Sequence, residues 1–276
     1  MAEQIQTGLP EQYGPDLELR QEVARLRASL TALVLQKDEL LLVQCRQIET
    51  AYLRRFGPLE LRVYETFCAC LRAKRRAKLI RADRNRRTPV NLDRVEQTLE
   101  AEFEEYRQEL DQRFRRVAGA MDRREGPGLS QQGTRELKDR YRFLVKALHP
   151  DLHPGEPEER ARTLQQAMRA YRAGDLDTLR TLCDTLEPPE ARQPDTLQAL
   201  EAEAARLRGE IKAQNRLLEK IKADYPMKMR VYLEDEEKAK ARELELQAQL
   251  QDLRDRISRY ETAVEEMLQA EQEELE

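Results

Sequence analysis

Residues 137–154 read Leu-Lys-Asp-Arg-Tyr-Arg-Phe-Leu-Val-Lys-Ala-Leu-His-Pro-Asp-Leu-His-Pro, and this stretch decides how the chain folds. Its apolar residues recur at the spacing of one buried helix face, at Leu137, Tyr141, Leu144 and Leu148. A different face of the same helix carries cations four residues apart, at Lys138, Arg142 and Lys146. The sequence therefore predicts a helix with one apolar face and one basic stripe.

Two prolines are expected to end this helix. Pro150 and Pro154 lack the backbone N–H that a continuing helix needs, and Pro150 also disfavours helical dihedral angles at His149. A second helix is expected to begin at Pro157. Its apolar face would consist of Leu164, Ala167, Met168 and Tyr171. The two helices should run antiparallel, joined by a stiff polar loop that carries His149 and Asp151.

Two antiparallel helices joined by a His-Pro-Asp loop resemble the J-domain of the DnaJ co-chaperone family. The matching residues are the apolar face of the first helix, the tripeptide at 149–151 and the Ala-Tyr pair at 170–171. The resemblance implies a co-chaperone or adaptor that engages a DnaK-type ATPase chaperone and stimulates its ATP hydrolysis. The basic stripe would dock on an acidic patch of that ATPase, and Asp151 would pair with a cation of the partner.

The residues before this module favour a different interpretation. A J-domain opens with a short helix, which the Gly- and Pro-containing stretch at 125–133 cannot supply. The alternative is a coiled-coil scaffold or interaction protein in which the J-like module is vestigial. Exposed side chains at His149 and Asp151 would favour a docking role. Burial of these side chains under another helix would favour the scaffold.

A third short helix is expected to complete the module. Gly174 is a suitable helix stop, and Asp175 is a suitable N-cap for the helix that follows. The apolar face of that helix would consist of Leu176, Leu179, Leu182 and Leu186.

The composition favours long helices over one large globular core. Of the 276 residues, 39% are hydrophobic, 37% are charged and 5% are aromatic, with no Trp. Such polarity is typical of helices that bury only a narrow apolar seam. We therefore expect an all-α protein, in which long helices and coiled coils flank a small central J-domain-like helical hairpin.

Four regions are expected along the chain. Residues 1–14 would form a disordered lead, and residues 15–124 an N-terminal helical and coiled-coil region. The J-domain-like module would occupy 134–187. A C-terminal coiled-coil hairpin would occupy 193–273, with its bend at 224–226. A dimer of extended helices is the alternative for these last two helices, because an exposed apolar seam can pair with any partner.

The apolar repeat of the N-terminal region changes phase once. It runs from Leu19 to Leu33 and resumes in a new phase at Leu41, as at a stutter in a coiled coil. The first helix is expected to break at Gly57-Pro58. Helices near 59–87 and 91–123 should follow.

The helix that follows Pro58 ends in a basic run. Nine basic residues face one acid between 72 and 87. Nucleic-acid phosphates are one possible partner, through Arg75, Arg76, Arg86 and Arg87. The acidic helix at 91–123 is the other, and it is favoured because no aromatic residue interrupts the run to stack on bases. That acidic helix is also expected to cover Tyr141 and Tyr171.

The sequence shows no nucleophile motif, Gly-rich phosphate loop or distinct carboxylate pair, so no enzyme activity and no cofactor are expected. His149 and His153 are the only histidines, and the prolines prevent the helical spacing with which two histidines share a zinc ion. The cysteines lack metal-site spacing and are expected to be reduced: Cys45, Cys68, Cys70 and Cys183.

The chain has no secretory signal and no apolar run of 18 residues, which predicts a cytoplasmic protein without a membrane partner. The expected partners are a DnaK-type ATPase, and a client protein or second copy through the coiled coils. Nucleic acid is not among the expected partners.

Overall fold

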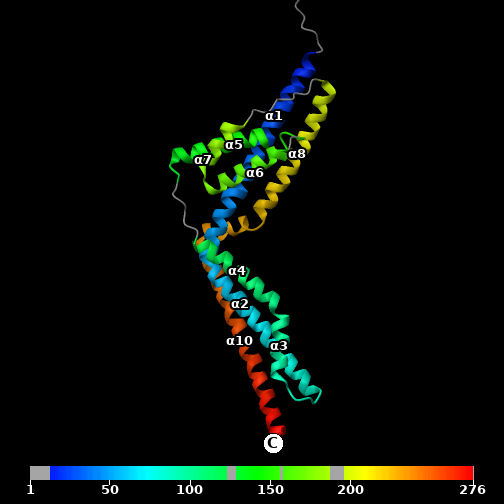
Figure 1. Cartoon of the computed structure of the whole chain (residues 1–276), viewed down its shortest axis with the longest axis vertical. Coiled ribbons are helices and arrows are strands. Elements are labelled where there is room, and N and C mark those ends of the chain that lie inside the picture. The colour runs from blue at the N-terminus through cyan, green and yellow to red at the C-terminus, as the bar shows by residue number, and fades with distance from the viewer. Residues whose placement is uncertain (1–12, 123–128, 156–157, 187–195, 276) are drawn as a thin grey trace, which may run out of the picture. The chain divides into compact units, whose positions relative to one another are not determined.

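The computed structural model describes residues 13–122, 129–155, 158–186 and 196–275. Every regular element in these ranges is a helix, which confirms the all-α prediction (Figure 1). The expected lead at 1–14 and the Gly- and Pro-containing stretch at 125–133 lie wholly or partly outside the described residues.

The chain divides into two compact units. The first unit contains residues 1–46 and 127–228, and the second contains residues 47–126 and 229–276. This division differs from the predicted regions, because 15–124 and 193–273 each contribute to both units.

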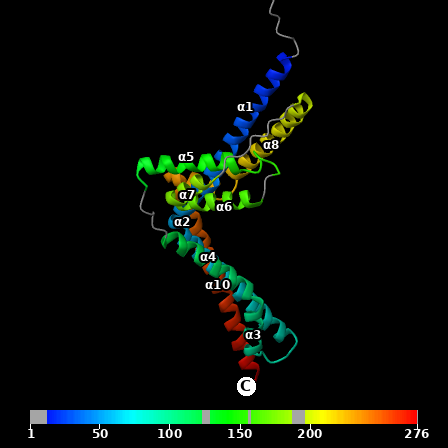
Figure 2. The same cartoon turned by 45° about the horizontal axis from the view of Figure 1, so that its top comes forward.

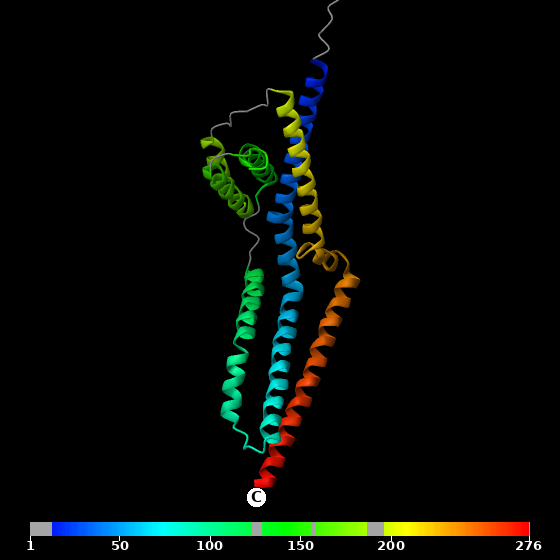
Figure 3. The same ribbon diagram turned by 90° about the vertical axis from the view of Figure 1, so that its right-hand side faces the viewer.

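Two long helices form the frame of the first unit. Helix α1 (Tyr13–Asp38) packs lengthwise against α8 (Leu197–Ala223), as Figures 1 and 3 show. Ion pairs of Arg27 with Glu203 and of Arg208 with Glu22 show that the two helices are antiparallel. The seam between them buries Val23, Leu30, Val34, Leu200, Ala204 and Leu207.

A π-helix, η1 (Glu39–Gln44), continues α1 at the point where the apolar repeat changes phase. A π-turn accommodates one residue more than an α-turn, and this extra residue rotates the apolar positions that follow it. The phase change noted between Leu33 and Leu41 therefore has a structural counterpart in the backbone.

The hairpin predicted for 193–273 is not found. Helix α8 pairs with α1 in the first unit, whereas α10 (Glu236–Leu275) belongs to the second. The periodicity of α8 was a sound indication of a buried seam, but such a seam does not specify its partner. The predicted bend is present, since α8 ends at Ala223 and is followed by η2 (Met227–Arg230) and α9 (Val231–Glu234).

Three short helices form the module of the first unit: α5 (Gln131–Leu148), α6 (Glu158–Ala173) and α7 (Leu176–Thr185). Figure 2 shows them grouped together. The predicted stops are confirmed: His149 is the extended C-cap of α5, and Gly174 ends α6 with φ +73°. Asp175 caps α7 by accepting a hydrogen bond from the backbone N–H of Thr178 at 3.0 Å.

Helix α1 and the π-helix cover the module's apolar face. The core they share includes Leu30 and Val34 from α1 and Leu144, Ala167 and Leu179 from the module, all less than 1% exposed. Tyr141 and Tyr171 are buried as expected, and within the first unit their cover comes from the residues around Asp38. The helix predicted at 91–123 belongs to the second unit.

The second unit is built on α2 (Cys45–Asn85), of which residues 47–85 belong to it, together with α10. The break predicted at Gly57-Pro58 is wrong, because α2 continues through both residues. A proline inside a helix costs about 3 kcal/mol. Packing around the fully buried Phe56, which contacts α10, offsets this cost. Gly57 lies against Val117, where a Cβ atom would come within 3.0 Å of a methyl group.

The expected acidic helix is divided at Phe103 into α3 (Leu92–Glu102) and α4 (Glu104–Asp122). Internal pairing of the basic run with this acidic region is confirmed. Arg72 and Arg76 both pair with Glu96, and Arg75 pairs with Glu102 at 2.6 Å.

Candidate functional site

The His-Pro-Asp loop is tightly folded. The backbone N–H groups of Leu152 and His153 both donate to the carbonyl oxygen of His149 at 3.0 Å. The N–H of Asp151 donates to the Nδ1 atom of His149 at 3.2 Å, and the ring of His153 contacts the carbonyl of Lys146 at 2.6 Å. These hydrogen bonds within the loop and the end of α5 hold the loop in one conformation without a binding partner.

His149 is buried, with 7% of its surface exposed, whereas Pro150 is exposed. Because Nδ1 accepts a hydrogen bond, the neutral ring carries its proton on Nε2. Burial lowers the pKa of His149, and the carboxylate of Asp151, 3.8 Å away, opposes this shift. The imidazole is thus a neutral part of the core.

Asp151 is held by α8. Its Oδ2 atom accepts a hydrogen bond from Nε2 of Gln214 at 2.7 Å, and its carbonyl oxygen accepts one from Nη1 of Arg206 at 3.1 Å. Gln214 is only 8% exposed, and its other amide atom, Oε1, is buried with no hydrogen-bond partner in the described part of the chain. Burying a polar amide costs free energy unless it is hydrogen-bonded, and the bond to Asp151 offsets part of that cost for Gln214.

A polar network joins the module to α1. The rings of Tyr141 and Tyr171 stack with centroids 4.2 Å apart. The Tyr141 hydroxyl donates to the buried carboxylate of Asp38 at 2.6 Å, and the Tyr171 hydroxyl donates to Glu39 at 2.5 Å. Burial, with the nearby carboxylates, raises the pKa of both tyrosines, so both hydroxyls remain protonated donors.

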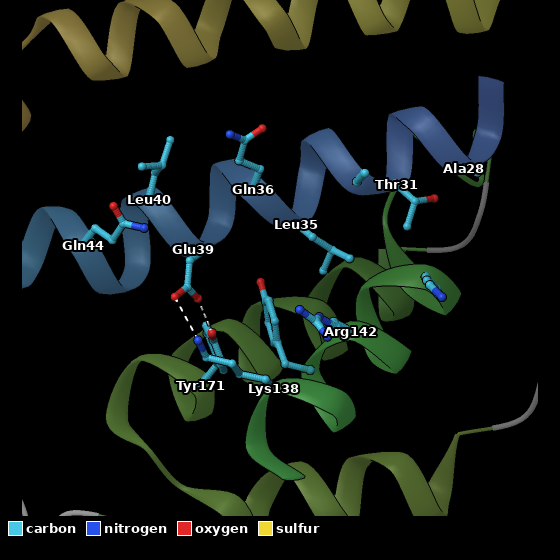
Figure 4. A pocket seen from close by; sticks show the side chains of 13 residues that line it. Ala28, Thr31, Leu35, Gln36, Glu39, Leu40, Gln44, Lys138, Arg142 and Tyr171 are labelled. Atoms are coloured by element: carbon cyan, nitrogen blue, oxygen red, sulfur yellow. Dashed lines mark hydrogen bonds and ion pairs between the residues drawn. The ribbon is translucent and has the colours of Figure 1, made fainter. Parts of the chain in front are cut away.

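The basic stripe faces a cavity of about 690 Å³ between α1 and α5 (Figure 4). Lys138 spans it to form an ion pair with Glu39 at 3.2 Å. Arg142 is 58% exposed and approaches Asp139 at 3.5 Å. Lys146 is exposed, and no ion pair of its side chain is found among the described residues.

The structure thus gathers the predicted residues of the module but presents them differently. Lys138, Arg142 and Lys146 line one cavity, while His149 and Asp151 face the frame helices. Sequence reasoning missed four contributors: Asp38, Glu39, Arg206 and Gln214. Gln214 carries a visible signal, because it is a polar residue within the apolar repeat of α8, but this position does not indicate a bond to the loop.

The predicted nucleic-acid residues are in the second unit and do not act as one group. Arg75 and Arg76 are engaged by Glu102 and Glu96. Arg86 and Arg87 are exposed where α2 ends.

Three further observations concern the described residues. They contain no cluster of three His, Cys, Asp or Glu side chains arranged to hold a metal ion. Their helices include none whose length and apolar character would suit a bilayer crossing. Their four cysteines are free thiols.

Comparison with known proteins adds no assignment. No protein-family model matches the chain, and neither a curated protein nor a solved structure is significantly similar to it.

Proposed function

We propose that this protein is a non-enzymatic helical scaffold, in which a J-like module is a fixed part of the structure. One observation carries the proposal: the Asp151 carboxylate is bonded to Gln214 of α8, while His149 is buried beside it. Docking by this loop would require the carboxylate to leave an amide that has no other hydrogen-bond partner in the described structure. A free and exposed tip would carry no such cost.

The module is bonded to the frame helices at a second place. Tyr141 and Tyr171 donate to carboxylates at the junction of α1 and the π-helix. A buried, hydrogen-bonded network of this kind favours one arrangement of the parts over others. The scaffold acts by presenting this fixed arrangement to other proteins.

Single-turnover ATP hydrolysis by a DnaK-type chaperone tests the proposal. The scaffold predicts the same rate without added protein, with the wild type and with Asp151→Asn. A rate that rises with the wild type and falls back with Asp151→Asn or His149→Gln would refute it.

A second candidate function is a co-chaperone whose loop must first leave α8. It is favoured by the exposure of Arg142, Lys146 and Pro150, which leaves part of the expected docking face open to solvent. Substitution Gln214→Leu removes the side-chain bond to Asp151 and separates the two candidates. Stimulation of ATP hydrolysis by this variant, and not by the wild type, would support the co-chaperone.

A further inference from the structure

The cavity between α1 and α5 has two chemically different walls. Along α1 and the π-helix, small or apolar side chains, among them Ala28, Ala32 and Leu35, alternate with the uncharged polar Thr31, Gln36 and Gln44. Along α5, Lys138 and Arg142 line the opposite wall (Figure 4). Lys146 of the same helix also lines the cavity and makes this wall basic. A segment that binds here would therefore meet mostly small or uncharged side chains on one side and cations on the adjoining side.

The charge of the cavity is unbalanced. Three cations line it against one carboxylate, Glu39, and that carboxylate already accepts bonds from Lys138 and Tyr171. Arg142 approaches Asp139 of its own helix at 3.5 Å but is 58% exposed, and Lys146 has no ion pair among the described residues, so positive charge remains in the half of the stripe nearest the His-Pro-Asp loop. An anionic partner would neutralise it, and partly screened charges of this kind steer association.

The shape restricts the partner further. The stripe from Lys138 to Lys146 is about 12 Å long at the rise of an α-helix. Lys138 lies inside the cavity and pairs with Glu39 of the facing helix, whereas Arg142 and Lys146 are exposed at its open side. A single helix with carboxylates four residues apart matches the stripe, since each pair of such carboxylates is about 6 Å apart along the axis.

We propose that this cavity binds one acidic amphipathic helix of a partner protein. The inference rests on the scaffold function and names the chemistry of its partner. Carboxylates of the bound helix pair with Arg142 and Lys146, and its apolar side chains pack on Ala28, Ala32 and Leu35.

Fluorescence anisotropy with a labelled synthetic peptide tests the inference on the full-length protein. The probe is an amphipathic helix of about four turns, with Glu at every fourth position of one face and Leu on the adjoining face. The control probe replaces each Glu by Gln. We expect the Glu probe to bind at least about tenfold more tightly, and to lose that advantage as salt is raised.

Two substitutions distinguish the cavity from the rest of the surface. Ala32→Trp places a large ring between the walls without changing charge and should abolish binding. Ser29→Trp is the matched control, because Ser29 is an exposed residue of α1 that does not line the cavity. The double variant Arg142→Glu/Lys146→Glu should weaken binding of the Glu probe by more than about tenfold. Circular dichroism melting confirms that each variant is folded.

Each other outcome overturns the inference. Equal affinity for the Glu and Gln probes would show that the negative charge of the probe does not contribute to binding. Equal affinity of the two Trp variants for the Glu probe would show that the peptide binds outside the cavity. Self-association in sedimentation equilibrium that is lost with Ala32→Trp would make the occupant a second copy of this chain. None of these results changes the ATP-hydrolysis rates that test the scaffold itself.

Discussion

Replacing Asp151 by alanine should destabilise the first unit, because it leaves the buried amide of Gln214 without its partner. The lost bond joins a carboxylate that is 27% exposed to an amide on a residue that is 8% exposed. Hydrogen bonds to charged groups are worth about 1.5–3 kcal/mol, and partial exposure of the carboxylate places this one near 2 kcal/mol. For a unit of this size we expect the melting temperature to fall by about 5 °C. The bond from Arg206 is to the backbone and remains.

The reciprocal substitution should be nearly neutral. In Gln214→Leu, Asp151 regains contact with water, and an apolar side chain replaces an amide whose Oε1 atom is buried without a partner. We expect a change within about 0.5 kcal/mol, because the substitution removes the unsatisfied Oε1 atom together with the bond, and the 27% exposed carboxylate of Asp151 can bond to water instead. The double variant Asp151→Ala/Gln214→Leu should then be only slightly less stable than Gln214→Leu alone. The double-mutant cycle should give a coupling energy between Asp151 and Gln214 of about 1.5 kcal/mol.

Thermal and urea unfolding, followed by circular dichroism, measure all four proteins of this cycle. Asp151→Asn is an intermediate case, since its amide oxygen can still accept the bond without the charge. Additive effects of the two substitutions, or an unchanged melting temperature for Asp151→Ala, would refute the claim that α8 holds the loop.

Three further predictions concern other parts of the chain. Tyr141→Phe should lower the free energy of unfolding in urea by about 2–3 kcal/mol, because Asp38 is 3% exposed and loses a hydrogen bond. Tyr171→Phe should lower it by only about 0.5–1 kcal/mol, since Glu39 keeps its ion pair with Lys138. Equal losses would contradict the network. The Arg180 and Arg140 guanidinium groups lower the pKa of Glu136 to about 2. Because the pKa is lower in the folded state, ionised Glu136 stabilises the protein above the usual carboxyl pKa, and this stabilisation is lost as the pH falls toward 2. Glu136→Gln should therefore make the free energy of unfolding depend less on pH on the acid side. An unchanged slope would argue against the pairing. Gly119→Ala should stabilise the second unit by about 0.5–1 kcal/mol, because an added Cβ atom meets nothing within 4 Å. Gly57→Ala should stabilise it less, or destabilise it, because the added Cβ atom would crowd Val117. Equal gains in melting temperature would show that the side chain of Val117 moves freely.

Local rules were sufficient to predict the module. The apolar spacing of α5, the stop at His149 and the cap at Asp175 each depend on neighbouring residues, and each is confirmed by the structure. The phase change before Leu41 was also visible in the sequence, although the π-helix behind it was not.

Partner choice could not be predicted from the same rules. Helix α8 has the periodicity of a buried seam, and this pattern fits α1 as well as α10. The continuation of α2 through Pro58 depends on packing around Phe56 that the local sequence does not show. The bond between Gln214 and Asp151 joins residues 63 positions apart, so it follows from the α1–α8 pairing and not from either segment.

Amide hydrogen exchange of the His-Pro-Asp loop tests most directly whether the loop is part of the core. The N–H groups of Asp151, Leu152 and His153 all donate bonds to His149. We predict that these amides exchange as slowly as those of α5 and α8, and that Gln214→Leu speeds their exchange before that of either helix. Fast exchange of the loop in the wild type, with α5 and α8 protected, would contradict the account.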